Sequence, residues 1–328
     1  MQIIKVKHPL LEQQRPTEDT VLIMGFFDGV HLGHQKVIKT GVDLARKHGL
    51  KSVLLTFDRS PRTVYQHETD YKYLSTMDRK AELVEKLGVD RLYFVEFGQA
   101  FAQLKPQEFV NQYMIDLKAK FVVAGFDYTY GKKDIANMQT LPQYSHNEFE
   151  IVTVPEQVLD DRKIGSSAIK QFISENKVEE ANKFLGYTYQ NQGTVVHGLQ
   201  RGRTLGYPTA NLATEGNQLI PSIGVYATRI KVGDTWYNSM TSVGYNVTFK
   251  ENTGVTIETN IFDFDADIYG EYVALEWVKY LRGEVKFDGA SGLVKQLELD
   301  KINSIKVLSK NKRTWANDNR DVIKSSLF

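Results

Sequence analysis

The stretch Gly25-Phe26-Phe27-Asp28-Gly29-Val30-His31-Leu32-Gly33-His34 places two histidines three residues apart, between an apolar run and a helical pattern. The preceding run, Val21 to Met24, has the composition of a buried strand. From Val37 to Ala45 apolar residues repeat at helical spacing, and Gly49 suits the C-terminal cap. The sequence therefore predicts a strand, a glycine-rich loop and a helix, with His31 and His34 at the start of the helix.

This position favours phosphate binding. The first N–H groups of a helix are unpaired and carry the positive end of its dipole. Residues at i and i+3 share a helix face, so His31 and His34 can act on one phosphoryl group. A histidine pair at this spacing is by itself most often a cap or a packing residue. The strand and the three glycines around it favour a functional site.

The composition is that of an ordinary globular protein. The chain has 328 residues, of which 41% are hydrophobic and 25% charged, with a formal net charge of +1. This length suffices for two domains, and the charge predicts neither nucleic acid nor a membrane as a partner. The absence of cysteine excludes disulfides and thiolate chemistry. No signal peptide or membrane span is evident, so we expect a cytoplasmic enzyme.

The order of patterns predicts two architectures. In the first part, strand-like runs alternate with helical ones, which favours a parallel sheet covered by helices, that is, an α/β domain. The expected helices include residues 75–87, with Ser75 and Asp78 as start signals, and 106–117. Residues 167–185 have a helical pattern. Short β-rich runs between Tyr189 and Trp277 then predict a small antiparallel barrel, and residues 293–307 a terminal helix. We expect domains at 1–185 and 186–328.

The stretch around His31 resembles the phosphate-binding motif of HxGH-type nucleotidylyltransferases, in the form found in the adenylylating half of prokaryotic FAD synthetases. Three other segments resemble the same family: 56–58 followed by Pro61, 125–132, and 164–170. The resemblance implies a Rossmann-like domain that transfers adenylyl from ATP to FMN, with His31 and His34 catalytic and Mg²⁺ as cofactor. The positions it assigns to nucleotide phosphates are Gly25, Phe27, Asp28, Gly33, Asp127, Ser166, Ser167 and Lys170. The positions it assigns to flavin are Asp58 and Pro61.

A second motif runs from Gly202 to Leu212, GRTLGYPTANL. Its glycines and proline shape a loop whose N–H groups can face phosphates. Thr209 and Asn211 are two residues apart, so on an extended segment their oxygens point the same way and suit a hard cation such as Mg²⁺. A polar strand end with capping side chains is the alternative interpretation.

This second motif resembles the GRxLGxPTAN motif of riboflavin kinases. The resemblance continues through 221–227, 243–249, 258–270 and 281–288. It implies a kinase that converts riboflavin and ATP to FMN, with Glu258 as general base, Thr209 and Asn211 as metal ligands and Arg282 near the flavin. The positions it assigns to nucleotide phosphates here are Gly202, Arg203 and Gly206. A ribityl hydroxyl is a poor nucleophile, so a carboxylate base suits the chemistry.

Some positions depart from these family patterns. Lys170 replaces an arginine and loses the bidentate fork that matches phosphate. Ser167 replaces a threonine, Ser60-Pro61 replaces His-Pro, and Asn260 replaces a histidine. We therefore hypothesise that adenylylation is weaker or more conditional than usual, for instance on the redox state of the flavin.

Together the two motifs predict a bifunctional riboflavin kinase/FAD synthetase acting on riboflavin, FMN, FAD and ATP. Two alternatives stay open. One is a riboflavin kinase with a degenerate nucleotide-binding N-terminal domain. The other is a non-catalytic flavin sensor, which would need neither metal ligands nor a base. A homo-oligomer is also left open by the sequence.

Overall fold

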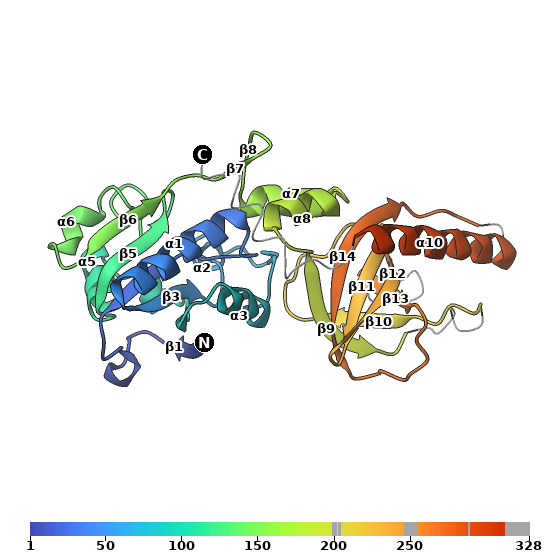
Figure 1. Ribbon diagram of the computed structural model, residues 1–328, viewed down its shortest axis with the longest axis horizontal. Coiled ribbons are helices and arrows are strands. Elements are labelled where there is room, and N and C mark those ends of the chain that lie inside the picture. The colour runs from blue at the N-terminus through green and yellow to red at the C-terminus, as the bar shows by residue number, and fades with distance from the viewer. Residues whose placement is uncertain (199–201, 203–204, 246–254, 288, 312–328) are drawn as a thin grey trace. The chain divides into compact units, whose positions relative to one another are not determined.

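The protein is described here from a computed structural model that covers residues 1–198, 202, 205–245, 255–287 and 289–311. The chain forms two compact units, Met1–Ser166 and Ser167–Phe328 (Figure 1). The predictions made for Arg203 and for residues 246–249 lie outside the described residues.

The first unit is built on a six-stranded parallel sheet with the strand order β1-β4-β3-β2-β5-β6. The strands are β1 (Gln2–Val6), β2 (Thr20–Met24), β3 (Lys51–Phe57), β4 (Arg91–Val95), β5 (Ala119–Gly125) and β6 (Glu150–Val154). Strand β2 is buried along its whole length, as a central strand of a covered parallel sheet must be. A small hairpin of β7 (Val158–Leu159) and β8 (Arg162–Lys163) follows the sheet.

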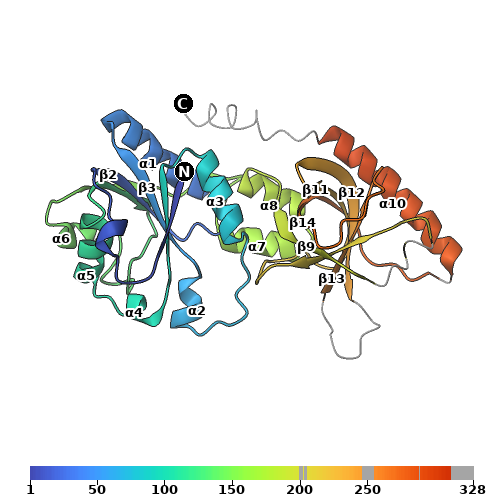
Figure 2. The same cartoon turned by 90° about the horizontal axis from the view of Figure 1, so that it is seen from below.

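Helices cover both faces of this sheet. They are α1 (Leu32–His48), α2 (Pro61–Tyr65), α3 (Met77–Lys86), α4 (Gln99–Ala102), α5 (Pro106–Val110), α6 (Leu141–Ser145), a 3₁₀ turn at Glu12–Gln14 and a π turn at Asn111–Ile115. Figure 2 shows α1 and α3 on one side of the sheet and α2, α4 and α5 on the other. The first side is packed closely at Gly41 in α1, where a Cβ atom would lie 2.3 Å from Cγ1 of Ile23 in β2.

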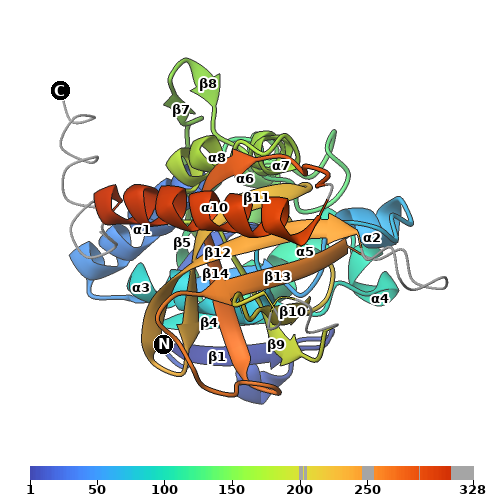
Figure 3. The same cartoon turned by 90° about the vertical axis from the view of Figure 1, so that its right-hand side faces the viewer.

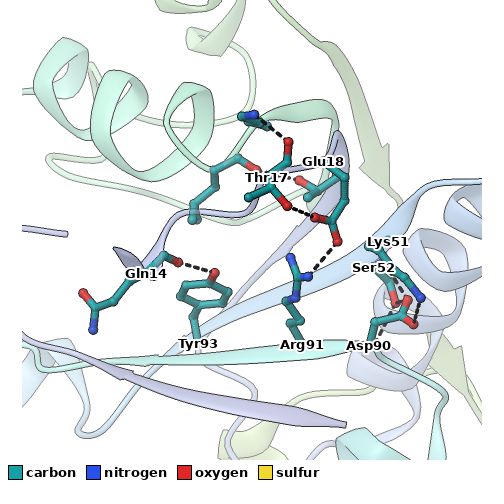
Figure 4. A network of polar contacts seen from close by, with 11 residues as sticks. Gln14, Thr17, Glu18, Lys51, Ser52, Asp90, Arg91 and Tyr93 are labelled. Atoms are coloured by element: carbon teal, nitrogen blue, oxygen red, sulfur yellow. Dashed lines mark hydrogen bonds and ion pairs between the residues drawn. The ribbon is translucent and has the colours of Figure 1, made fainter. Parts of the chain in front are cut away.

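A polar network fastens the N-terminal segment to the sheet (Figure 4). The Arg91 guanidinium lies 2.6 Å from the Glu18 carboxylate, and the Tyr93 hydroxyl donates to the Gln14 carbonyl at 2.6 Å. The Asp90 carboxylate accepts from both the backbone N–H and the hydroxyl of Ser52. These contacts join β3 and β4 at the ends where the strands begin and leave the opposite edge of the sheet for a site.

The second unit is a closed antiparallel barrel with the strand order β10-β13-β12-β11-β14-β9. Its strands are β9 (Gln190–Val196), β10 (Ala210–Thr214), β11 (Gly224–Val232), β12 (Thr235–Tyr245), β13 (Val255–Ile261) and β14 (Tyr272–Arg282). Its helices are α7 (Ser166–Ser174), α8 (Val178–Leu185) and α10 (Ala290–Lys310). Figure 3 shows α10 lying across the barrel, where it packs on β11, β12 and β14.

The predicted fold class, a parallel sheet with helices followed by a small barrel and a terminal helix, is confirmed. Two details of the prediction were wrong. Thr76, not Ser75, caps α3, because the Ser75 hydroxyl accepts from the Gly29 N–H instead. The helical run 167–185 is divided into α7 and α8 around Asn176, whose φ of 62° interrupts a helix.

Candidate active sites

In the first unit two predicted motifs meet at the same edge of the sheet. Strand β2 ends at Met24 and its neighbour β5 ends at Gly125, and the loops that follow them are 25–31 and 126–132. The chain proceeds from β2 to β3 on one side and reaches β5 and β6 on the other, so the strand order reverses between β2 and β5. In open α/β sheets, ligands bind in the crevice at such a reversal point, outside the carboxyl ends of the strands.

The loop after β2 has a constrained backbone. Phe27 and Val30 are buried yet have φ values of 53° and 39°, in the left-handed region that side chains disfavour. Gly25 allows the chain to pass the Phe27 ring, because a Cβ atom there would lie 2.6 Å from it. Strain of this kind persists only where the surroundings hold it, and it clusters at functional sites.

The two histidines lie together at the start of α1. His31 is the N-cap residue, and its Nδ1 accepts from the backbone N–H of His34 at 3.2 Å. The imidazole rings stack with centroids 3.5 Å apart and an interplanar angle of 17°. Since Nδ1 of His31 is an acceptor, Nε2 carries the hydrogen in the neutral ring and is available as a donor.

Both histidines are held neutral. Burial lowers the pKa of His31 to about 4. Burial, followed by the charges of His31 and Lys80, lowers the pKa of His34 well below its usual range. Nδ1 of His34 is buried and has no hydrogen-bond partner among the residues that the structure describes. A site of this kind offers N–H donors to a ligand without first requiring a proton.

The other predicted residues of this unit occupy varied positions. The Asp28 carboxylate accepts from the Leu74 backbone N–H at 2.8 Å, so it anchors the loop that contains Leu74. The Ser166 hydroxyl donates to the Asp28 carbonyl at 3.0 Å, which brings the 164–166 segment to the histidine loop. Asp127 is 63% exposed and lies 3.5 Å from Nζ of Lys163. Ser167 and Lys170 lie on α7, in the part of the chain assigned to the second unit.

Asp58 and Pro61 flank an aromatic pocket. The Asp58 carboxylate accepts from the Phe97 backbone N–H at 2.9 Å and pairs with Arg59. Pro61 is the first residue of α2, capped by Ser60, and it lines a cavity of about 60 Å³. The lining includes Phe57, Tyr65, Phe97, Phe101, Phe109 and Tyr130. Aromatic walls of this kind can stack on a flat ring, but a cavity of about 60 Å³ admits only part of one.

Sequence reasoning missed Lys80. This residue of α3 is only 4% exposed, and its ammonium group donates to the Phe26 carbonyl at 2.8 Å. It thus lies at the base of the histidine loop. A signal was present in the sequence, because Lys80 stands on the apolar stripe that includes Leu83 and Val84.

In the second unit the barrel brings Asn211 and Glu258 together. Asn211 in β10 pairs directly with Glu258 in β13, so the two side chains share one face of the sheet. Thr209 lies two residues before Asn211 and lines a cavity of about 400 Å³, together with Pro208 and residues 264–269. The motif that precedes β10 and the glutamate on β13 are therefore neighbours across strands.

The segment before β10 is fixed from two sides. The Tyr207 N–H donates to the Gly202 carbonyl at 2.9 Å, and Gly206 has a φ of 80° that favours glycine. The Asn260 amide donates to the Pro208 carbonyl at 2.7 Å. The asparagine that replaces the family's histidine therefore fastens the loop, a contact that the sequence alone did not suggest.

Arg282 is engaged by the terminal helix. Its guanidinium forms a bidentate pair with Asp300 of α10, at 2.9 Å from Nε and 2.6 Å from Nη2. Asp300 is buried and also accepts from Gln296. In this state the Arg282 side chain holds α10 against the end of β14.

Neither a membrane helix nor an acidic metal cluster is found in the described part of the chain. No helix there is long and apolar enough to cross a bilayer. Within the same residues, no group of three or more histidine, aspartate and glutamate side chains is placed to hold a metal ion. A cation in the second unit would depend on neutral oxygens, such as those of Thr209 and Asn211, and on its ligand.

Comparison with known proteins finds a different family model for each half of the chain. A family model described as FAD synthetase matches residues 13–168, and one described as riboflavin kinase matches residues 185–308. A bifunctional riboflavin kinase/FMN adenylyltransferase from Listeria monocytogenes is 44% identical, with 92% of this chain and 96% of that protein covered. The protein of the same name from Bacillus subtilis is 39% identical, covering 94% and 99%.

A solved structure supports the same fold over most of the chain. The crystal structure described as a macrolide-efflux protein from Streptococcus pneumoniae has a TM-score of 0.85 and 37% identity. The match covers 93% of this chain and 99% of that one. On the identity and coverage of the curated relatives, this chain belongs to the family of bifunctional riboflavin kinase/FMN adenylyltransferases.

Proposed function

We propose that this chain performs the two reactions of its family at two separate sites. The barrel domain, residues 186–328, phosphorylates riboflavin with ATP to give FMN and ADP. The sheet domain, residues 1–185, then transfers adenylyl from a second ATP to FMN and releases pyrophosphate. We place the enzyme in the cytoplasm, with these small molecules as its partners rather than nucleic acid or a membrane.

The observation that carries the kinase assignment is the cross-strand pair of Asn211 and Glu258. In the proposed reaction the Glu258 carboxylate takes the proton from the ribityl 5′-hydroxyl as that oxygen attacks the γ-phosphorus. The bond between the γ-phosphorus and the β–γ bridging oxygen breaks, and ADP leaves. A base within hydrogen-bond reach contributes about 10²–10⁴-fold to such a step.

The oxygens near Glu258 fit Mg²⁺. The Thr209 hydroxyl and the Asn211 amide are hard oxygen donors two residues apart; Asn211 is paired with Glu258 across β10 and β13, and Thr209 precedes β10 and lines the cavity. Mg²⁺ is usually held by few protein ligands together with substrate phosphates, so a small neutral set is adequate. When bound, the ion would neutralise phosphate charge as the γ-phosphoryl group is transferred. Asn260 keeps the segment in place by holding the Pro208 carbonyl.

The observation that carries the adenylylation assignment is the stacked, neutral histidine pair at the start of α1. The FMN phosphate is ionised near neutral pH, so it can attack the α-phosphorus of ATP without a protein base. Catalysis then depends on positioning and on donors to the phosphate oxygens. Nε2 of His31 and the His34 ring are the proposed donors, with the N–H groups of Phe27 and Gly33. The Gly25 N–H donates to the Leu55 carbonyl, so we propose that Gly25 gives the phosphates close approach rather than a donor.

The remaining assignments support the same reaction. We propose that Asp127, Ser166, Ser167 and Lys170 contact the nucleotide, and that the pocket beside Asp58 and Pro61 receives the flavin ring. In the barrel we propose Gly202, Arg203 and Gly206 for the ATP phosphates. Arg282 can reach riboflavin only if its pair with Asp300 opens or is shared.

Product analysis tests the proposal. The purified chain is incubated with riboflavin, ATP and Mg²⁺, and flavins are separated by chromatography, in parallel with oxidised and reduced flavin. We expect FMN to form first and FAD to follow. FMN alone under both conditions would indicate a kinase with a degenerate first domain, and no ATP consumption would indicate a flavin sensor. Equal adenylylation rates with oxidised and reduced FMN would contradict the redox hypothesis.

A further inference from the structure

The ammonium group of Lys80 lies buried beneath the histidine loop. Besides the Phe26 carbonyl at 2.8 Å, Nζ has the Thr56 hydroxyl at 3.4 Å and the Phe57 carbonyl at 3.5 Å as partners. It also lies 4.5 Å from the centre of the Phe26 ring. All these contacts are at the carboxyl ends of β2 and β3, where the nucleotide site is proposed.

This buried cation has no ion-pair partner within 4.0 Å among the described residues. The groups that act on it electrostatically are Asp28 and Asp58, and it acts in turn on His34. Asp28 and Asp58 bind the backbone N–H groups of Leu74 and Phe97. Burial lowers the pKa of Lys80 to about 8, although both carboxylates raise it.

A structural role does not account for burying this charge. The Phe26 carbonyl also accepts a hydrogen bond from the Thr56 hydroxyl at 2.8 Å, so it is satisfied without Lys80. A buried ammonium group that is not paired with an anion destabilises the folded state relative to an apolar side chain. Such a group at a site edge indicates a ligand that brings the opposite charge.

The same contact orients a peptide group. In a trans peptide the C=O and N–H bonds point in opposite directions, so anchoring the Phe26 carbonyl directs the Phe27 N–H away from Lys80. This N–H donates to no residue that the structure describes. Phe27 has a φ of 53°, so the peptide is held in an orientation that the backbone alone disfavours.

We propose that Lys80 is a positioning residue for adenylyl transfer. It holds the Phe26–Phe27 peptide so that the Phe27 N–H meets the phosphates of ATP on the far side of that peptide, and their negative charge stabilises the buried ammonium group through space. This inference rests on the proposed adenylylation at the histidine site. It adds a residue on α3, outside every motif that identified the site.

The test compares Lys80→Met with Lys86→Met, a control that removes an exposed lysine from the same helix. FMN adenylylation and riboflavin phosphorylation are measured on each protein, so the kinase serves as an internal standard. For Lys80→Met we expect the KM for ATP in adenylylation to rise about tenfold or more, because ground-state and transition-state binding are lost together. We expect kinase kinetics to be unchanged and the melting temperature to be unchanged or higher. Lys86→Met should match the wild type in all three.

A second readout separates charge from packing. The wild-type KM for ATP in adenylylation should rise between about pH 7 and pH 9 as the ammonium group loses its proton, and this rise should be absent in Lys80→Met. An unchanged KM in Lys80→Met, or an equal pH dependence in both proteins, would overturn the inference. A wild-type chain that makes no FAD from FMN would instead refute the proposed function itself.

Discussion

The histidine pair differs from an ordinary one because burial, rather than a neighbouring acid, sets its protonation. His31 is 5% exposed, and its Nδ1 is already engaged by the His34 N–H. Protonation at Nδ1 would remove this acceptor and place a charge in a site with little water. The ring is therefore a neutral N–H donor over the whole physiological range of pH.

The same feature predicts how stability depends on pH. A histidine with a pKa of about 4 in the folded state and about 6.5 in the unfolded state binds its proton more readily when unfolded. Stability due to the neutral ring is complete above about pH 6.5 and is lost as pH falls towards 4. Asparagine in His31→Asn can still cap the helix but does not titrate. Between pH 6.5 and pH 4 we therefore expect this variant to lose roughly 3 kcal/mol less free energy of unfolding than the wild type.

Hydrogen exchange of the β2 amides in the two proteins measures this difference. Strand β2 lies in the first unit, so its amides report on the unit that contains His31. Tryptophan fluorescence does not report on that unit, because tryptophans 236, 277 and 315 all belong to the second. An identical decline of protection below pH 6.5 in wild type and His31→Asn would contradict the assigned neutral state.

Individual functional residues were predicted from the local sequence pattern and from the family resemblance. The position of His31 at the start of a helix was predictable from the glycines around it and from the apolar repeat that follows it. Lys80 was not recognised, and Asn260 was noted only as a departure from the family pattern, because their contacts are with residues 54 and 52 positions away in the chain. A lysine on an apolar stripe is the one local sign that could have indicated the first of these.

Among the elements, α10 is attached to the barrel by a buried ion pair in addition to its apolar packing. Asp300 is buried beneath the helix and accepts from Arg282 through two nitrogens and from Gln296. Asp300→Asn leaves the Arg282 charge without its carboxylate, and removing one partner of a buried pair costs about 3–5 kcal/mol. Because Arg282 keeps a side-chain exposure of 21%, we expect the lower end of this range.

Denaturant unfolding followed by tryptophan fluorescence checks this prediction, since Trp277 is fully buried in the barrel. Exposed Asp234 provides a matched Asp→Asn control, because its contact is a surface pair with Lys231. Equal unfolding midpoints for Asp300→Asn and Asp234→Asn would contradict the role given to the pair.

Helices and strands with a strong apolar periodicity were predictable from the sequence. Strands that form mainly because a neighbouring strand pairs with them were missed. Helix α1 and its Gly49 cap, and strands β3, β5 and β11, followed from their apolar patterns. Strands β1 and β12 were not predicted. Strand β1 is mostly exposed and β12 is rich in polar residues, so neither has a clear apolar pattern. They form strands because β1 pairs with β4 and β12 pairs with β11 and β13.

In the whole molecule, the two candidate sites are built on different elements. The first has the histidine loop and the ends of β2, β3 and β5, and the second has the barrel strands β10 and β13. Apart from Ser167 and Lys170 of α7, which we propose for the nucleotide, the residues named for the histidine site belong to the first unit and those named for the barrel site to the second. The two reactions should therefore be separable by substitution, with FMN as the only compound that links them.

The most direct test of this account is complementation between two variants. His31→Asn should convert riboflavin to FMN and stop there, whereas Glu258→Gln should fold normally and convert FMN, but not riboflavin, to FAD. Mixed together with riboflavin, ATP and Mg²⁺, they should produce FAD through free FMN. Loss of both reactions in either variant, or no FAD from the mixture when each variant retains its own reaction, would contradict the account of two independent sites.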